Sequence, residues 1–438
     1  MKLLASFFLL SFAAVAHAAS PSSIVGTWQG SVTSHHQQVP VTLTISGSPK
    51  QLKAALVNGP EESQASSATF QGGHLVIAFN YYARKIDATV TNGTLTGTFG
   101  TVAVNYPVTA KLVSAKPVPT PAPAATAPNA PDIQGDWEVA TTSAKGESAW
   151  QLRIHEIGPA ANRTSGTGGT SGTRQIQAVI QRIDGDTGSL FGAWDGTSYL
   201  VSHLTAAGPA LYSFTPQPDG TLLVSNLLRA DLKPAPQQQN LVARRPAEAR
   251  KQNLAAPTDP TQQTSVKDPS VPFAFSFPDL NGKTVSNTDP QFDGKVVIVA
   301  IGGSWCPNCH DEAPFLVSLY KQFHSMGLEI VNLSFEEEDN FNDPTRLRAF
   351  IARYGIPYTV LLAGQTEQLS EKIPQGVNLN CWPTSFFLGR DGLVKEVHAG
   401  FAGPANPPAH EALKREVTEL IERLLAEPAP VRTAALKR

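Results

Sequence analysis

Apolar and polar residues alternate with a period of two along the first half of the chain. Val41–Ile45 reads Val-Thr-Leu-Thr-Ile, which is typical of a half-buried strand. Ala88–Thr91 and Thr94–Gly97 flank Asn92-Gly93, the strongest short signal for a hairpin turn. These patterns predict antiparallel β structure.

This β pattern occurs in two sections, residues 22–115 and residues 132–245. In the second section Asp184-Gly185, Asp195-Gly196 and Asp219-Gly220 mark turns between strand candidates such as 177–180 and 222–224. A Gly/Thr/Ser tract over 164–173 predicts a loop. Each section should therefore form a small β domain, a barrel or a sandwich.

The two sections also begin alike. Ile24–Trp28 and Ile133–Trp137 share an Ile-x-Gly-x-Trp frame, which indicates a degenerate internal repeat. Gly-x-Trp on a first strand resembles lipocalin-like barrels, and that resemblance would imply a ligand cavity. The alternative, which we expect, is that the Trp plugs one end of a small barrel or sandwich.

From residue 272 onward, runs typical of strands alternate with runs typical of helices. Such alternation predicts an α/β domain with a central parallel or mixed sheet. The expected strands are 296–301, 328–335, 358–362, 385–388 and 393–397, and the expected helices are 306–324, 344–354 and 411–425. The last helix carries an apolar stripe that includes Leu413, Val417 and Leu420.

Segments rich in proline separate these sections. We expect a Pro/Ala-rich linker at 116–131 and a second linker at 246–271. Met1–Ala18 reads as a secretory signal peptide, with Lys2, a short apolar run and an Ala-x-Ala cleavage site. The complete prediction is a signal peptide at 1–18, β domains at 22–115 and 132–245 with a linker at 116–131, a second linker at 246–271, an α/β domain at 272–426 and a tail at 427–438.

Composition limits the partners and the location. With 34 Lys+Arg against 36 Asp+Glu and no basic block, nucleic acid is not an expected partner. The apolar part of the signal is shorter than the roughly 20 residues that a membrane span needs. We therefore expect export to the periplasm or cell envelope, with no membrane span once the signal is removed.

The chain has 3 cysteines, Cys306, Cys309 and Cys381. An exported scaffold held together by disulfides would use more of them, spread over the sequence. Cys306 and Cys309 instead lie three residues apart, after the strand candidate 296–301 and at the start of a helix. That spacing is typical of a redox-active disulfide, with Cys306 as the attacking thiol and Cys309 as the resolving thiol.

Two other chemistries use similar residues. Cys306–His310 also reads Cys-x-x-Cys-His, the attachment signature of c-type haem, for which Met326 is the one axial methionine candidate in the mature chain. Cys306, Cys309 and His310 could instead bind a metal, although neighbouring helix residues point in different directions. We expect neither a metal nor an organic cofactor.

Residues 272–425 resemble a TlpA/ResA-type thioredoxin-like domain, the redoxin group of exported thiol–disulfide oxidoreductases. The matching residues are Trp305–Cys309, Glu312, Pro314, Trp382-Pro383-Thr384 and the turn Asp391-Gly392. The resemblance implies that Pro383 is cis and lies against the redox pair, and that Glu312 assists proton transfer at Cys309. For Glu312 the alternative is an interaction with the helix dipole. The resemblance also implies a substrate groove formed by Trp305, Pro307, Trp382 and Pro383.

The chain departs from this family at several positions. Pro307-Asn308 stands between the cysteines, where reducing members more often have Pro directly before the second cysteine, so the direction of electron flow is open. Trp382 is bulkier than usual, and Cys381 is an addition that could approach the pair or be a small buried residue. Peroxiredoxins, a related class, need Thr three residues before the reactive cysteine, and this chain has Gly303.

The sequence therefore predicts an exported thiol–disulfide oxidoreductase that exchanges disulfides with protein substrates in the cell envelope. A membrane redox partner is implied, because an exported dithiol has to be recycled. The alternatives are a thiol peroxidase of the redoxin class and an envelope binding protein that uses its β domains, with a metal-binding or secondary redox domain. We expect the acidic run 336–339 to be a solvated loop and assign it no role.

Overall fold

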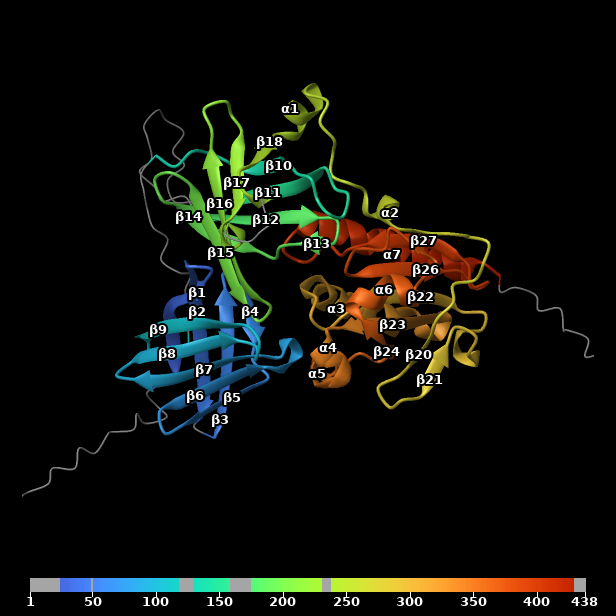
Figure 1. The fold of residues 1–438 in the computed structure, drawn as a ribbon, viewed down its shortest axis with the longest axis horizontal. Coiled ribbons are helices and arrows are strands. Elements are labelled where there is room, and N and C mark those ends of the chain that lie inside the picture. The colour runs from blue at the N-terminus through green and yellow to red at the C-terminus, as the bar shows by residue number, and fades with distance from the viewer. Residues whose placement is uncertain (1–23, 49, 118–128, 158–174, 231–237, 429–438) are drawn as a thin grey trace, which may run out of the picture.

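The computed structural model describes residues 24–48, 50–117, 129–157, 175–230 and 238–428. Two β barrels and an α/β domain follow one another along the chain and pack together (Figure 1). The predicted signal peptide 1–18 and the loop 164–173 lie outside the described residues. So do most of the linker 116–131 and the end of the tail.

The first barrel is an antiparallel sheet with the strand order β2-β1-β9-β8-β7-β6-β5-β3-β4, and it closes because β2 also pairs with β3. Asn92-Gly93 forms the predicted turn between β7 and β8, with both residues at positive φ. Its elements are β1 (Gly26–Ser34), β2 (Gln37–Ser48), β3 (Gln51–Asn58), β4 (Glu61–Gln64), β5 (Ser67–Gln71), β6 (His74–Phe79), the 3-10 helix η2 (Asn80–Tyr82), β7 (Arg84–Thr91), β8 (Thr94–Gly100) and β9 (Asn105–Ser114).

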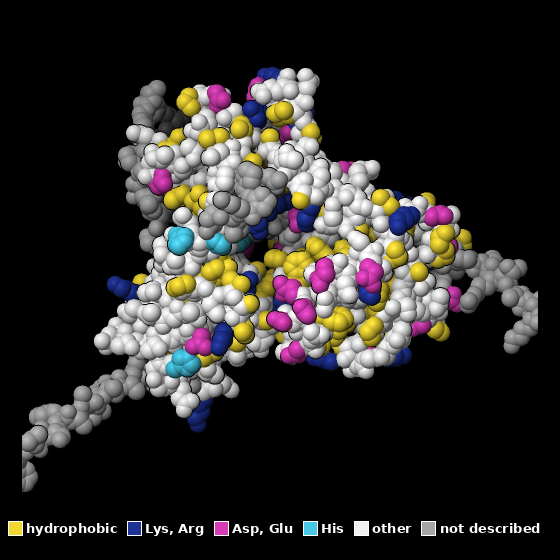
Figure 2. Space-filling model, in the orientation of Figure 1, with side chains coloured by type: hydrophobic (Ala, Val, Ile, Leu, Met, Phe, Trp, Pro, Cys, Tyr) yellow, Lys and Arg dark blue, Asp and Glu magenta, His cyan; other side chains and the backbone are white. Residues whose placement is uncertain are grey.

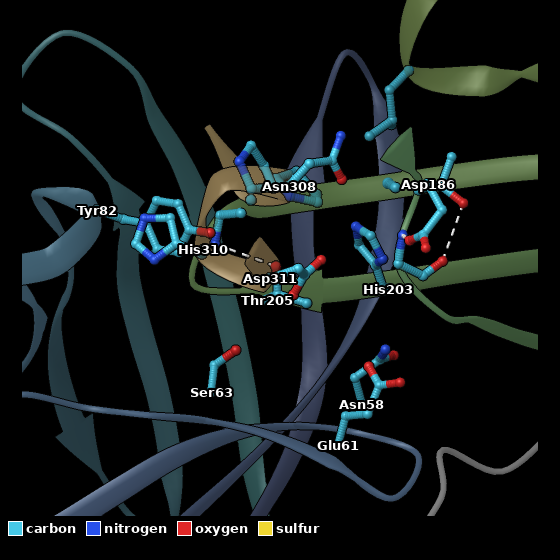
Figure 3. A pocket seen from close by; sticks show the side chains of 18 of the residues that line it. Asn58, Glu61, Ser63, Tyr82, Asp186, His203, Thr205, Asn308, His310 and Asp311 are labelled. Carbon is cyan, nitrogen blue, oxygen red and sulfur yellow. Dashed lines mark hydrogen bonds between the residues drawn. The ribbon is translucent and has the colours of Figure 1, made fainter. Parts of the chain in front are cut away.

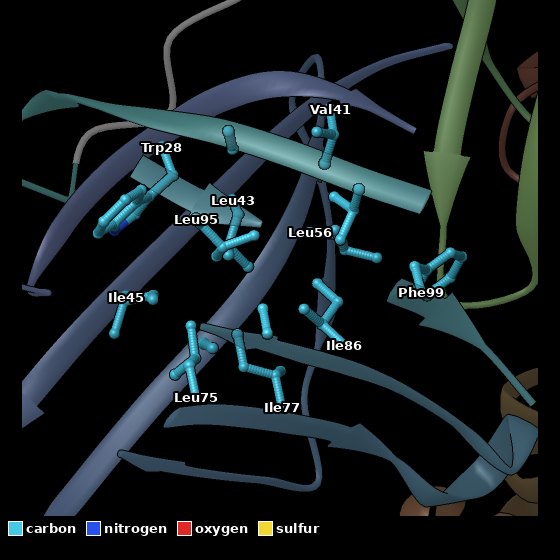
Figure 4. Packing of buried hydrophobic residues seen from close by; sticks show 14 of the residues in the cluster. Trp28, Val41, Leu43, Ile45, Leu56, Leu75, Ile77, Ile86, Leu95 and Phe99 are labelled. Atoms are coloured by element: carbon cyan, nitrogen blue, oxygen red, sulfur yellow. The ribbon is translucent and has the colours of Figure 1, made fainter. Parts of the chain in front are cut away.

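Apolar side chains fill the interior of this barrel (Figure 4). Trp28, Leu43, Ile45 and Phe99 are all buried there. Because every second residue of a strand faces inward, the alternation seen in the sequence supplies this packing. Trp28 is therefore part of a packed core, in agreement with the plug that the sequence predicts.

The second barrel repeats this construction with the order β11-β10-β18-β17-β16-β15-β14-β12-β13, closed by a pairing of β11 with β12. Trp28 Nε1 donates to the Ile24 carbonyl at 2.8 Å, and Trp137 Nε1 donates to the Ile133 carbonyl at 2.9 Å. The internal repeat therefore extends to the hydrogen bonding of both tryptophans. The strands are β10 (Gly135–Ala140), β11 (Ala149–Ile157), β12 (Gln175–Arg182), β13 (Gly185–Asp186), β14 (Leu190–Trp194), β15 (Tyr199–Thr205), β16 (Gly208–Pro216), β17 (Leu222–Asn226) and β18 (Leu241–Arg244).

The C-terminal domain has a five-stranded mixed sheet with the order β24-β23-β22-β26-β27. β22 is parallel to β23 and antiparallel to β26, as in a thioredoxin-like domain. The main elements are β22 (Val296–Gly302), α3 (Pro307–Phe323), β23 (Leu328–Glu336), α4 (Glu338–Asn342), α5 (Thr345–Tyr354), β24 (Thr359–Gln365), α6 (Leu369–Lys372), β26 (Thr384–Leu388), β27 (Val394–Ala399) and α7 (Pro407–Ala426).

The central strand β22 is buried along its whole length. On one face Val296, Ile298 and Ala300 pack against apolar side chains of α3 and α7. The other face packs against α6 and the segment that contains Phe273 and Phe275. No helix among the described residues is long and apolar enough to cross a membrane.

The segment 246–271, predicted to be a linker, instead contains ordered elements. They are α1 (Pro246–Lys251), α2 (Pro260–Gln263) and β19 (Ser265–Val266), which pairs with β25 (Gly376–Val377). Gln263 donates to the Lys145 carbonyl and to Asn380 Oδ1, at 2.8 and 3.0 Å. Asp259 caps α2 by accepting a hydrogen bond from the Thr261 N–H. The pairing of β19 with β25 then fixes the residues that follow α2.

Candidate redox site

Cys306 is the N-cap residue of α3, and its sulfur accepts a hydrogen bond from the Cys309 backbone N–H at 3.2 Å. The buried strand β22 ends four residues earlier, and Pro307 begins the helix with a φ that suits a first turn. Both cysteines are free thiols and are buried, with 2% and 5% of their surface exposed. The sequence therefore places an anion-accepting helix end directly under one sulfur.

Cys309 and Glu312 share a small buried cavity. Its volume of about 10 Å³ is close to the space that one water molecule needs. Burial raises the pKa of the Cys309 thiol well above its usual range, and the neighbouring Cys306 raises it further. Burial also raises the pKa of Glu312 to about 7, although a hydrogen bond from Ser385 Oγ at 2.9 Å acts in the opposite direction. A carboxyl group with this pKa can take or give a proton near neutral pH.

The predicted cis-proline is present, since the Trp382–Pro383 peptide bond is cis. Trp382 packs edge-on against Trp305, with 5.5 Å between the ring centroids. Trp305 Nε1 in turn donates to the Phe335 carbonyl at 3.0 Å, which fixes this ring. Three of the four predicted groove residues, Trp305, Trp382 and Pro383, therefore lie together. Pro307 instead lines a cavity shared with the barrels.

The expectation of a solvated acidic loop is wrong for Glu336. This carboxylate is fully buried at the end of β23, and it receives Arg346 Nη2 at 2.8 Å. It also accepts hydrogen bonds from the backbone N–H and the hydroxyl of Ser304, at 2.9 and 2.7 Å. Since Ser304 is two residues before Cys306, a buried ion pair anchors the redox loop. Only 337–339 are exposed. Figure 2 shows acidic side chains gathered near the middle of this face of the molecule, beside an apolar area.

His310 follows the second cysteine and is held on both sides of its ring. Nε2 lies 2.9 Å from the Ser304 carbonyl, so it carries the hydrogen, and Nδ1 accepts from the Tyr354 hydroxyl at 3.0 Å. Burial lowers the pKa of His310 to about 3, which keeps the ring neutral. A haem or metal ligand would need one of these nitrogens to be free. Among the described residues, no group of three or more His, Cys, Asp or Glu is arranged to hold a metal ion.

Cys381 is fully buried, and it packs in an apolar cluster with Ala399 and with Ile183 of the second barrel. Burial raises the pKa of its thiol to about 12. Such a thiol carries very little thiolate at neutral pH and is a poor nucleophile. Of the two roles considered for Cys381, the structure favours the small buried residue.

A cavity of about 620 Å³ lies where all three domains meet (Figure 3). The C-terminal domain contributes Pro307, Asn308 and Asp311, while Glu61 and Asp186 come from the first and second barrels. Burial raises the pKa of Asp311 well above its usual range, and the charges of Asp186 and Glu61 raise it further. The helix that carries the redox pair is therefore in contact with both barrels, which no local pattern in the sequence indicated.

Comparison with known proteins finds relatives for this domain. The AhpC/TSA family matches residues 269–397. The thiol–disulfide oxidoreductase ResA of Bacillus anthracis is 30% identical over 122 residues, which are 28% of this chain and 64% of that protein. ResA of Bacillus subtilis strain 168 is 29% identical over 126 residues, which are 29% of this chain and 64% of that protein. The chain thus covers less than two thirds of the length of these relatives.

Solved structures similar to the same region include a thiol:disulfide interchange protein of Chlorobium tepidum TLS, at 25% identity and a TM-score of 0.29. The matched region makes up 37% of this chain and 100% of the Chlorobium chain. StoA of Bacillus subtilis is 21% identical, with a TM-score of 0.25 and shares of 34% and 98%. TM-scores this low carry no argument. The similarity of the domain therefore rests on the sequence matches and on the observed sheet order. The C-terminal domain is therefore similar to ResA-type thiol–disulfide oxidoreductases, as Trp305–Cys309 and Pro383 predicted, and residues 269–397 match the AhpC/TSA family.

Proposed function

We propose that this chain is an exported thiol–disulfide oxidoreductase that exchanges disulfides with protein substrates in the cell envelope. The observation that carries the proposal is the arrangement of Cys306, Cys309 and Glu312. One sulfur caps α3, the other lies one turn into the helix, and a water-sized cavity joins the second sulfur to a carboxyl group with a pKa of about 7.

In the reducing direction, the Cys306 thiolate attacks one sulfur of a substrate disulfide. A bond forms between Cys306 and that sulfur, the substrate S–S bond breaks, and the other substrate sulfur leaves as a thiolate. The N–H groups in the first turn of α3 stabilise the negative charge on Cys306 before the attack. Trp305, Trp382 and Pro383 flank the site and hold the substrate chain.

Cys309 then resolves the mixed disulfide. Its proton passes to Glu312 through the small cavity, and the resulting thiolate attacks the Cys306 sulfur. The Cys306–Cys309 disulfide forms, the remaining substrate sulfur leaves, and two electrons have moved to the substrate. Run backwards, the same steps oxidise a substrate dithiol. Either way, a membrane redox partner has to restore the pair.

The AhpC/TSA match also suggests a second function, that of a thiol peroxidase. Peroxiredoxins need a Thr at the position of Gly303. A Cβ atom added to Gly303 would lie 2.4 Å from the Phe335 carbonyl oxygen and 2.4 Å from Trp305 Nε1. The loop therefore has no room for the threonine, which favours disulfide exchange over peroxide reduction.

Trapping of substrates tests the proposal. A Cys309→Ala variant should accumulate mixed disulfides through Cys306 with envelope proteins, because the resolving thiol is missing. The matched control is Cys306→Ala with Cys309→Ala, which should trap nothing, and Cys309→Ala with Cys381→Ala should trap as Cys309→Ala does. The purified chain should also reduce insulin disulfides. Absence of both trapped partners and insulin reduction would overturn the proposal, and a measured reduction potential would set the direction.

A further inference from the structure

One segment of the second barrel, Ile183–Asp186, lies directly on the redox motif. Asn308, which stands between the two cysteines, donates from Nδ2 to the Asp184 carbonyl at 2.8 Å. Gly185 forms a parallel β-bridge with Phe401, just after β27. Figure 1 shows β13 against the C-terminal domain, beside α7. The contact is thus made by backbone atoms of the barrel and by a side chain of the motif.

The fit at this contact leaves no room for a side chain. Gly185 has a φ of +129°, and a Cβ atom there would lie 2.4 Å from Asn308 Cγ and 2.6 Å from the Phe401 carbonyl oxygen. On the opposite side, a Cβ atom on Gly400 would lie 2.1 Å from the Ile183 carbonyl oxygen. Two glycines, one from each domain, therefore allow the backbones to approach this closely.

The segment touches both sides of the redox site. On the helix side it binds Asn308, two residues after Cys306. On the cis-proline side Ile183 packs on Cys381, and the Gly400 N–H donates to the Pro383 carbonyl at 2.7 Å. The segment is therefore anchored to residues on both sides of the redox pair, an arrangement that would place it across the approach to Cys306. This agrees with the 2% exposure of that residue.

Polar contacts hold the segment in place. The Gly403 N–H donates to Asp186 Oδ2 at 2.7 Å. Arg153 Nη1 donates to Asn406 Oδ1 at 2.7 Å, and Asn406 Nδ2 donates to Gln181 Oε1 at 3.0 Å. Asn406 is fully buried and makes no capping bond to α7, so its side chain is used for this contact between domains. Hydrogen bonds of this kind can be exchanged for water when the domains separate.

We propose that Ile183–Asp186 is a built-in gate that covers Cys306 and has to withdraw before a substrate sulfur can reach it. A thiolate has to meet the disulfide that it attacks, and a sulfur in a site this closed cannot do so. The gate goes beyond the proposed exchange reaction, because it concerns access to Cys306 whatever the substrate is. It predicts that loosening the segment increases the reactivity of this one thiol.

The rate of alkylation of Cys306 tests the gate directly. A Cys309→Ala, Cys381→Ala background leaves Cys306 as the single thiol, and its reaction with iodoacetamide is followed over a range of pH to separate exposure from ionisation. Gly185→Ala should clash with Asn308 and raise the limiting rate constant at high pH at least about tenfold. The control is Gly220→Ala in the same barrel, which also has positive φ but an open surrounding, and it should leave the rate unchanged.

Asn406→Ala is a second variant. If Gly185→Ala does not fold, Asn406→Ala shows whether the gate limits access to Cys306. It removes two hydrogen bonds between the domains and should also raise the rate. The gate is overturned if Gly185→Ala, or Asn406→Ala in its place, reacts at the rate of Gly220→Ala. Alkylation does not require exchange activity, so this result and a failure of the trapping experiment can be told apart.

Discussion

Tyr82 of the first barrel stacks on His310, with ring centroids 4.0 Å apart and an angle of 25° between the planes. The first barrel thus covers the residue that follows Cys309, while the second barrel binds the residue that precedes it. A neutral imidazole suits this position, because a charged one would be buried without a carboxylate partner.

Removing the stacked ring should expose His310. In Tyr82→Ala we expect the pKa of His310 to rise from about 3 toward its ordinary value of 6.5, since burial is the main cause of the shift. Titration of the imidazole by NMR measures this. Tyr82→Phe keeps the ring and should leave the pKa low. An unchanged pKa in Tyr82→Ala would mean that the barrel does not shield this histidine.

Glu312 should give the exchange reaction its dependence on pH. As the proton acceptor it works only when ionised, so the rate of the resolving step should rise as the pH passes about 7. Glu312→Gln should slow this step and remove the inflection. Ser385→Ala should move the inflection upward, because the hydrogen bond that it removes favours the ionised form. Glu422→Gln on exposed α7 is the control, and stopped-flow kinetics of the resolving step at several pH values provide the measurement.

Glu312 should also influence stability. Its folded-state pKa is raised above the ordinary value of 4.5, so the folded chain holds this proton more tightly than the unfolded chain does. The contribution is fully present below pH 4.5 and is lost as the pH rises through about 7. Denaturation at pH 5 and pH 8 should show Glu312→Gln losing less stability than the wild type over this interval. Equal losses would contradict the raised pKa.

Breaking the buried ion pair should destabilise the C-terminal domain. Arg346→Met leaves Glu336 buried without its partner, which should cost about 3–5 kcal/mol. Arg348→Met, on the exposed side of the same helix, should cost less than about 1 kcal/mol. Hydrogen exchange of peptides from β22 and β23 measures the opening of this domain alone. Similar costs for the two variants would show that the pair does not anchor the fold.

The repeated tryptophans should behave as a matched pair. Trp28→Phe and Trp137→Phe each delete a buried hydrogen bond to a carbonyl, so each should cost about 1–3 kcal/mol in its own barrel. Trp150→Phe is the control, because the buried Nε1 of Trp150 has no partner among the described residues. Its replacement should cost less. Hydrogen exchange of peptides from each barrel measures its free energy of unfolding and so compares the three variants.

Cys381 should play no part in the chemistry. At pH 8 its alkylation in the folded protein should be about a thousandfold slower than in the unfolded chain, because burial raises its pKa to about 12. Cys381→Ala should keep the full exchange rate. Peptide mapping that finds a disulfide between Cys381 and Cys306 or Cys309 would contradict this.

The sequence predicted the C-terminal domain well because its signals are local. The apolar run 296–301, the breakers around it and the helical spacing after Cys306 placed the five strands of the sheet and the helices α3, α5 and α7 within a few residues, whereas the short helices α4 and α6 were not predicted. The cis-proline also follows from a short motif. The alternation of apolar and polar residues predicted two β domains, and the paired Ile-x-Gly-x-Trp frames predicted that they are alike, while the choice between a barrel and a sandwich was left open.

The remaining features depend on residues far apart in the sequence. Glu336 was expected in solvent because it begins an acidic run, and its burial depends on Arg346, which comes from a separate helix. The contact between Asp184 and Asn308 spans 124 positions and uses a backbone carbonyl, which carries no sequence signal. The roles of His310 and of the segment 246–271 were missed for the same reason.

The short strand β13, which carries Gly185, pairs with β12 at the end of the sheet order, and β12 is in turn paired with β11 and β14 in the closed part of the second barrel. A movement of the second barrel would therefore also move Gly185. A partner that tilts the second barrel, by binding its surface away from the C-terminal domain, would separate Gly185 from Asn308 without contacting the redox site. Binding at a surface of the second barrel far from Cys306 would then be a means of controlling the reactivity of this thiol.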